Sequence, residues 1–183
     1  MTDPERPTVE AKLASGPGAA RRAARLAAVQ ALYQMALTGV TAKQAIAEFV
    51  RHRFVTSAGV DGQDDGSPSP TAEADRLLFA QIVEGVSQRT DDLDAMITST
   101  LAEEWKIERL EVLLLATLRA GAFELFASPS VPAAMIINDY VDVAHAFFAA
   151  REPAFVNAAL DRLARGLRPE AEEGRRAGTR RAR

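Results

Sequence analysis

Apolar side chains recur every three or four residues along most of the chain, and this spacing limits the fold more than any other feature. In residues 21–37 the recurring positions are Leu26, Val29, Tyr33 and Leu37, which lie on one stripe of an α-helix. No segment shows a convincing alternation of apolar and polar residues, as a half-buried strand would. The sequence therefore predicts an all-α fold.

Capping residues and prolines mark where the helices begin. Thr41 can cap the second helix, and Thr90 and Asp91 suit the start of another. Pro132 and Pro153 each stand at a plausible first helical position, where a missing N–H costs nothing. The expected helices cover residues 21–37, 42–54, 78–86, 90–101, 110–126, 132–148 and 153–167. We therefore expect a single-domain bundle of about seven packed helices.

The chain of 183 residues, with 48% hydrophobic content, is long enough for one domain with a sizeable core. Residues 56–70 are rich in Gly, Asp, Ser and Pro and predict a mobile loop. We expect a flexible extension over residues 1–18, a helical domain over residues 19–168 and a disordered basic tail over residues 169–183. Five arginines in that tail have no apolar anchor, namely Arg175, Arg176, Arg180, Arg181 and Arg183.

Charge is unevenly distributed along the chain. Residues 56–130 hold 14 acidic and 5 basic side chains, whereas residues 165–183 hold 7 basic and 3 acidic ones. Because phosphates are repelled by the acidic middle, a nucleic acid should bind near the two ends. The chain has no cysteine, no secretory start and no apolar run of about 18 residues, so we expect a cytoplasmic protein without membrane contact.

Motifs for catalysis or cofactor binding are absent from the sequence. There is no phosphate-binding glycine loop, no nucleophile motif and no pair of histidines at metal-ligand spacing. His52 and His145 stand far apart, and the acidic residues at 91–94 suit the first turn of a helix better than a cation site. Trp105 is expected to anchor the bundle rather than to stack on a base. We therefore expect no enzyme activity, no cofactor and no metal.

An arginine cluster at the start of the first expected helix is the strongest chemical feature. Arg21, Arg22 and Arg25 fall within about 100° of helical arc, so three guanidiniums are expected to project together from one end of the helix. Guanidinium groups bind phosphate through planar, bidentate contacts and keep their charge when partly desolvated. The cluster therefore predicts a phosphate-binding site, with an ordinary solvated surface as the alternative.

Several separated motifs together resemble the NusB family. They are the arginine cluster followed by AVQALYQ (28–34), then WKIERL (105–110), LRAGAFEL (118–125), VP (131–132), IIND (136–139), FVN (155–157) and LDRL (160–163). These motifs follow the family's order and spacing from about residue 21 to residue 167. Because several motifs are in register, the resemblance is far more specific than any one of them.

The resemblance implies a non-catalytic transcription antitermination factor that binds boxA-type RNA together with NusE, a small-subunit ribosomal protein. Both would act in an antitermination complex on RNA polymerase, while the choice between monomer and homodimer stays open. Family RNA contacts carry over to Arg21, Arg22, Arg25 and Phe155. Two departures each remove a possible phosphate contact, because Ala23 and Ala154 replace basic residues common in the family. Arg151 can offset one of them.

Two positions carry competing interpretations. Phe155 at the start of the last helix could pack in the core or stack on an RNA base. The helix at 110–126 has two apolar stripes, and the first includes Leu114, Leu118 and Leu125. The second is formed by Val112, Leu115, Phe123 and Phe126 and is interrupted by Arg119. That stripe is either buried or part of a NusE contact.

A charged pair common in the family is replaced here by Leu114 and Leu115. We therefore name Leu114, Leu115 and Arg119 as candidate partner-binding residues, in an apolar patch bordered by Glu111, Arg119 and Glu124. Two other functions remain open: a ribosome-assembly or protein-scaffold bundle, and an RNA-binding component related to ribosomal-RNA cytosine methyltransferases.

Overall fold

The computed structural model describes residues 18–51, 70–102, 106–149 and 151–169. Within these ranges the chain forms seven α-helices and one short 3₁₀ helix. They are α2 (Ala19–Thr38), α3 (Ala42–Phe49), α4 (Pro70–Gln88), α5 (Thr90–Thr98), η3 (Ile107–Arg109), α6 (Val112–Ala127), α7 (Ala133–Phe147) and α8 (Arg151–Leu167). The predicted all-α fold of about seven helices is confirmed.

Local sequence signals account for several helix ends. The Thr41 hydroxyl accepts a hydrogen bond from the Gln44 backbone N–H, while the Gln44 side chain accepts one from the Thr41 backbone N–H. This capping box satisfies two backbone donors that a helix start otherwise leaves unpaired. The last helix begins at Arg151 rather than at Pro153. Pro153 fits there because the N–H groups of a first turn have no partner within the helix.

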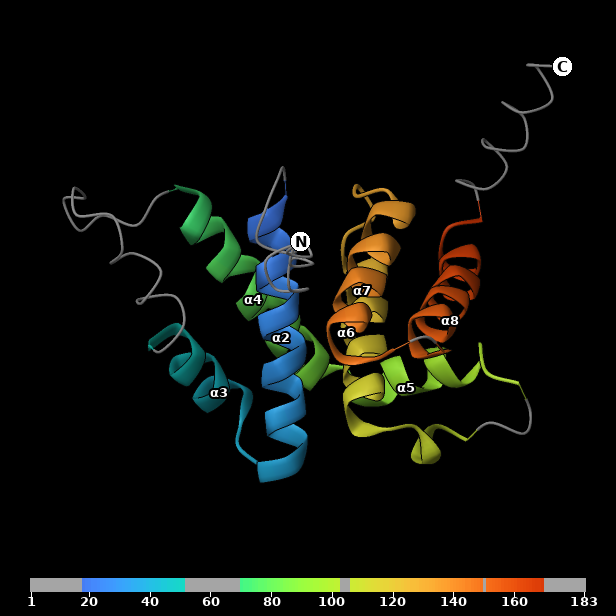
Figure 1. The fold of residues 1–183 in the computed structure, drawn as a ribbon, viewed down its shortest axis with the longest axis horizontal. Helices are drawn as coiled ribbons and strands as arrows, with labels where there is room; N and C mark the ends of the chain where they lie inside the picture. Colours follow the sequence, from blue (N-terminus) through green and yellow to red (C-terminus); the bar gives the residue numbers. More distant parts are fainter. Residues whose placement is uncertain (1–17, 52–69, 103–105, 150, 170–183) are drawn as a thin grey trace, which may run out of the picture.

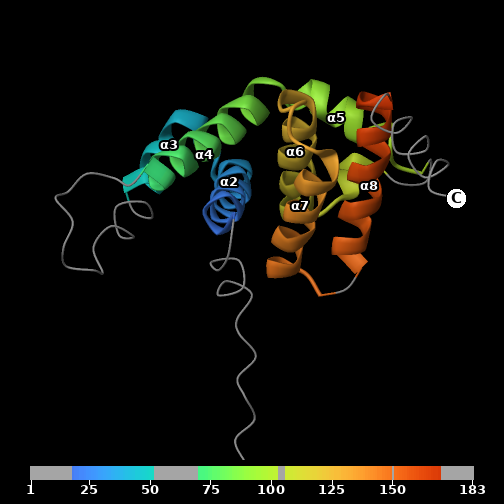
Figure 2. The same cartoon turned by 90° about the horizontal axis from the view of Figure 1, so that it is seen from above.

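Helix α6 lies at the centre and contacts five other helices (Figure 1). Helices α2, α3 and α4 pack together on one side of it, and α5, α7 and α8 lie on the other. From above, α7 lies between α2 and α8 (Figure 2). The α6 stripe containing Leu114, Leu118 and Leu125 is buried in the core, as its spacing predicts.

Close helix crossings at α6 depend on two glycines. A Cβ added at Gly85 of α4 would lie 2.0 Å from Cζ of Phe123, and one at Gly121 would lie 2.7 Å from Cδ1 of Leu160. Real Cβ atoms do not approach other atoms so closely. The missing side chains therefore allow α4 and α8 to pack against α6 at these two points.

Some predictions fall outside the described residues. These are the N-terminal extension, the loop before α4, Trp105, His52 and the arginines of the C-terminal tail.

Candidate nucleic-acid interface

The three arginines at the start of α2 occupy three different environments. Arg21 is exposed and Arg22 is partly buried, whereas the Arg25 residue is only 3% exposed. The expectation that three guanidiniums project together into solvent is therefore wrong for Arg25. Helical arc alone could not predict this, because burial depends on which other helices pack against that side of α2.

Arg25 belongs to a buried cluster formed by four side chains from three helices, which we call the Arg25 cluster. Its Nε and Nη2 donate to the two carboxylate oxygens of Glu124 on α6, at 2.7 and 2.8 Å. Its Nη1 donates to Oδ2 of Asp139 on α7 at 2.7 Å. The Tyr140 hydroxyl donates to Oε2 of Glu124 at 2.8 Å. The forked guanidinium thus connects α2 to both α6 and α7.

Burial and the neighbouring charges shift the pKa values of three groups in this cluster. Burial alone would lower the pKa of Arg25, but its hydrogen bond with Glu124 and the nearby negative charges raise that pKa overall. Burial raises the pKa of Asp139, and the charge of Arg25 offsets only part of that rise. Burial and the charge of Glu124 raise the pKa of Tyr140 well above its usual value. Arg25 therefore stays charged, and Tyr140 stays protonated, at neutral pH.

The start of α8 carries the other predicted RNA-binding residues. Arg151, the first residue of α8, is exposed. Phe155, one turn later, is partly buried and packs against the core. In Figure 2 the start of α2 and the connection from α7 to α8 both lie toward the lower edge, with α7 between the two helices, whereas in Figure 1 α2 begins near the top and α8 begins lower down. Arg21 and Arg151, 130 positions apart in the sequence, thus stand near the starts of two helices that both pack against α7.

The three candidate partner-binding residues on α6 differ in how far they are exposed and in what they contact. Leu114 is 7% exposed and belongs to the core, so its side chain is not available at the surface. Leu115 is partly buried. Arg119 donates to both carboxylate oxygens of Asp94 on α5, at 2.7 and 2.6 Å. The second apolar stripe is therefore divided, because Arg119 contacts α5 and Phe123 lies against Gly85 of α4, whereas Val112 is 40% exposed.

Glu124 was expected at the border of an exposed apolar patch, and this expectation is wrong. The residue is only 2% exposed because it faces Arg25 and Tyr140. A glutamate within the largely apolar sequence of α6 is a signal that sequence reasoning could have used, since a buried charge requires a partner. Asp139 and Tyr140 carried no comparable signal on α7.

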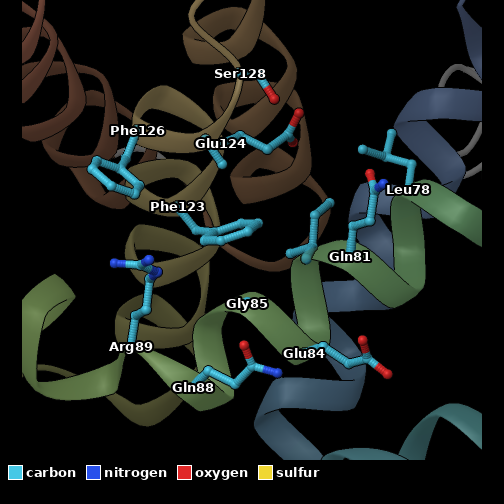
Figure 3. A pocket seen from close by; sticks show the side chains of 12 residues that line it. Leu78, Gln81, Glu84, Gly85, Gln88, Arg89, Phe123, Glu124, Phe126 and Ser128 are labelled. Carbon is cyan, nitrogen blue, oxygen red and sulfur yellow. The ribbon is translucent and has the colours of Figure 1, made fainter.

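A groove of about 460 Å³ lies between α4 and the end of α6 (Figure 3). The ring of Phe123 points toward Gly85 on one wall, and Phe126 lies near the other end. The guanidinium of Arg89 stands 5.0 Å from the centroid of the Phe126 ring, within the range of a cation–π contact. Phe126 remains 41% exposed, so part of the second stripe does reach solvent.

No group of three His, Asp or Glu side chains in the described ranges could hold a metal ion. None of the helices described here has the length and apolar character needed to cross a membrane.

The fold and this candidate site define an all-helical protein with an exposed arginine near the start of α2 and a buried ion-pair cluster about one turn further along that helix. The NusB family model matches residues 22–165. A transcription antitermination protein NusB of Maricaulis maris is 46% identical over 150 residues, covering 82% of this chain and 89% of the relative. One of Agrobacterium fabrum is 41% identical over 170 residues, covering 93% and 94%.

Solved structures of similar shape come from the same family. T. maritima NusB has a TM-score of 0.62 at 24% identity, covering 82% of this chain and 92% of that one. A NusB from a complex of NusB and NusE with double-stranded RNA has a TM-score of 0.60 at 22% identity, covering 80% and 97%. The chain belongs to the NusB family of transcription antitermination proteins.

Proposed function

We propose that this protein binds boxA-type RNA together with NusE and acts, without catalysis, in an antitermination complex on RNA polymerase. The observation that carries the proposal is the pair of exposed arginines, Arg21 and Arg151, near the starts of α2 and α8, two helices that both contact α7. Family membership supports it, because one solved relative forms a complex with NusE and RNA.

The start of α2 is proposed to supply the main phosphate contacts. Arg21 is exposed, and Arg22 follows it on the same turn with part of its side chain in solvent. An arginine side chain matches phosphate because two of its N–H groups can donate in parallel. Arg25, whose donors already bind Glu124 and Asp139, is left out of the direct contacts.

The start of α8 is proposed as the second contact. Arg151 would bind a phosphate and Phe155 would stack on a base, since aromatic side chains commonly bind unpaired RNA bases. The partial exposure of Phe155 leaves part of its side chain available, although the rest packs against the core.

A NusE contact is proposed at the partly exposed second stripe of α6. Leu115 offers apolar surface, and Arg119 stands beside it with its side chain 23% exposed. An apolar area bordered by charge is typical of a specific protein interface.

Fluorescence anisotropy with labelled RNA tests the proposal. Matched and scrambled boxA sequences are titrated with and without NusE, and each titration is repeated over a series of salt concentrations. The matched RNA should bind more tightly, and NusE should strengthen that binding. In Arg21→Ala/Arg22→Ala the slope of log affinity against log salt should fall by up to about 1.4, at about 0.7 for each single-strand phosphate contact.

A matched control removes the same charge elsewhere. Lys106 and Arg109 are exposed at the two ends of η3 and belong to neither of the two proposed RNA contacts. Lys106→Ala/Arg109→Ala should therefore leave the slope close to wild type. An equal fall in both variants would mean that the attraction is non-specific. NusE binding without any effect of RNA would instead indicate a protein scaffold.

A further inference from the structure

We propose that Arg25 is a positioning residue: the Arg25 cluster fixes the start of α2 so that Arg21 and Arg22 are held ready to bind RNA. The inference rests on the proposed RNA-binding function. It assigns to Arg25 a role distinct from that of a phosphate ligand.

The start of α2 has little to stabilise it locally. Its N-cap residue is Gly18, with φ of 84°, and no side chain caps the helix. No acidic residue stands in the first turn. Arg21 and Arg22 also place positive charge near the positive end of the helix dipole, which is unfavourable. A helix end of this kind tends to fray unless tertiary contacts hold it.

Arg25 supplies such a contact about one turn into the helix. Ala24 and Arg25 are the first residues of α2 to be buried. The guanidinium of Arg25 bonds directly to two other helices, and Arg22 acts electrostatically on the same Asp139 carboxyl group. Arg25 binds Glu124 with two hydrogen bonds and Asp139 with a third. Because Arg21 lies four residues before Arg25, about 6 Å along the helix axis, fixing Arg25 fixes the direction in which Arg21 projects.

The charged groups of the Arg25 cluster should matter more for the position of α2 than for the free energy of unfolding of the whole protein. Burying charges costs free energy that their mutual attraction only partly returns, so apolar replacements of a whole buried ion pair are often tolerated. A forked guanidinium shared between two helices, however, permits only a narrow range of positions for α2. Removing the cluster should therefore affect the ordering of the first turns of α2 more than the fold as a whole.

A triple variant, Arg25→Met/Glu124→Gln/Asp139→Asn, tests this inference. Methionine fills a similar length without charge, and the amide oxygen introduced by Glu124→Gln can still accept a hydrogen bond from Tyr140. The variant loses one positive and two negative charges, so charge alone would strengthen RNA binding. We expect a folded protein whose RNA affinity is about tenfold weaker, in line with the ordering cost of two flexible side chains. The salt slope should be unchanged, and amide hydrogen exchange in the first two turns of α2 should be faster.

Arg168 provides a matched control. Its guanidinium also joins separate segments, because it donates to the backbone oxygens of Val131 at 2.6 Å and Ser128 at 2.9 Å. Arg168 lies just after α8 and away from the start of α2 (Figure 1). Arg168→Met should lower the melting temperature while leaving RNA affinity and hydrogen exchange at the start of α2 unchanged.

Arg25→Lys is a second variant, needed if the triple variant does not fold. It keeps the charge, but an ammonium group cannot reproduce the fork that binds both carboxylates. We expect RNA affinity to fall several-fold with an unchanged salt slope. Wild-type affinity in a folded Arg25→Lys protein, or in the folded triple variant, would overturn the inference.

Two other outcomes separate the inference from the function on which it rests. If the triple variant also lowers the salt slope by about 0.7, Arg25 binds a phosphate directly and the positioning role is wrong. If Arg21→Ala/Arg22→Ala leaves RNA binding intact, the proposed RNA site itself fails. If that double variant weakens binding and the folded triple variant does not, only the inference about Arg25 fails.

Discussion

Replacing Gly85 with alanine should destabilise the protein, although alanine is the better helix former. Gly85 lies in α4 where that helix crosses α6, and the Phe123 ring points directly at it (Figure 3). A Cβ there would stand 2.0 Å from Cζ and 2.2 Å from Cε2 of the ring. These separations are more than 1 Å too short for carbon atoms in contact, whose optimum is about 3.5–4.0 Å. Either the ring or the α4 backbone must move.

The net effect is the difference between two opposing contributions. Removing a glycine from a helix interior contributes about 1 kcal/mol of stability. Overpacking a close contact costs about 1–3 kcal/mol. The ring lines an open groove and can turn partly into it. Several ring atoms would clash at once, however, so the overpacking cost should lie in the upper part of that range, and the protein should lose about 1–2 kcal/mol of folding stability in total. For a chain of this length that corresponds to a fall in melting temperature of about 2–8 °C.

Thermal melts followed by circular dichroism give the measurement, and two further variants test the reasoning. Gly166 stands in α8, where an added Cβ would meet nothing within 4 Å, so Gly166→Ala should raise the melting temperature. In a Phe123→Leu background the clash is smaller, and Gly85→Ala should cost much less there. A rise in melting temperature for Gly85→Ala alone, matching that of Gly166→Ala, would refute the reasoning.

Three further predictions concern single side chains. Because burial raises the pKa of Tyr140, the folded protein keeps a proton that the unfolded chain releases, and stability should fall as pH rises above about 10. In a Tyr33→Phe background, tyrosinate absorbance should appear only with unfolding, and its appearance in folded protein would contradict this. Phe155→Ala should cost about 1–3 kcal/mol of RNA binding, whereas a loss of stability alone, near the ~3–5 kcal/mol of a fully buried phenylalanine, would assign Phe155 to the core. Leu115→Glu should weaken NusE binding in a two-protein titration while RNA binding persists; unfolding would return Leu115 to the core, and normal NusE binding would remove it from the interface.

Local signals in the sequence were sufficient for the helices and, apart from the start of α4 at Pro70, for their approximate ends. The three-to-four-residue spacing of apolar side chains and the cap at Thr41 act within one or two turns, so they can be recognised without any tertiary information. The same holds for the basic character of residues 21–25 and for the apolar stripe of α6 that includes Leu118. These features depend only on residues that are neighbours along one helix.

The role of Arg25 was decided by tertiary structure alone. On a helical wheel it shares an arc with Arg21 and Arg22, and nothing local distinguishes the three. The distinction arises because α6 and α7 bring Glu124 and Asp139 to Arg25 from 99 and 114 residues away. A charged side chain is stable inside a protein only when such partners surround it. Its burial therefore depends on how separate helices pack together.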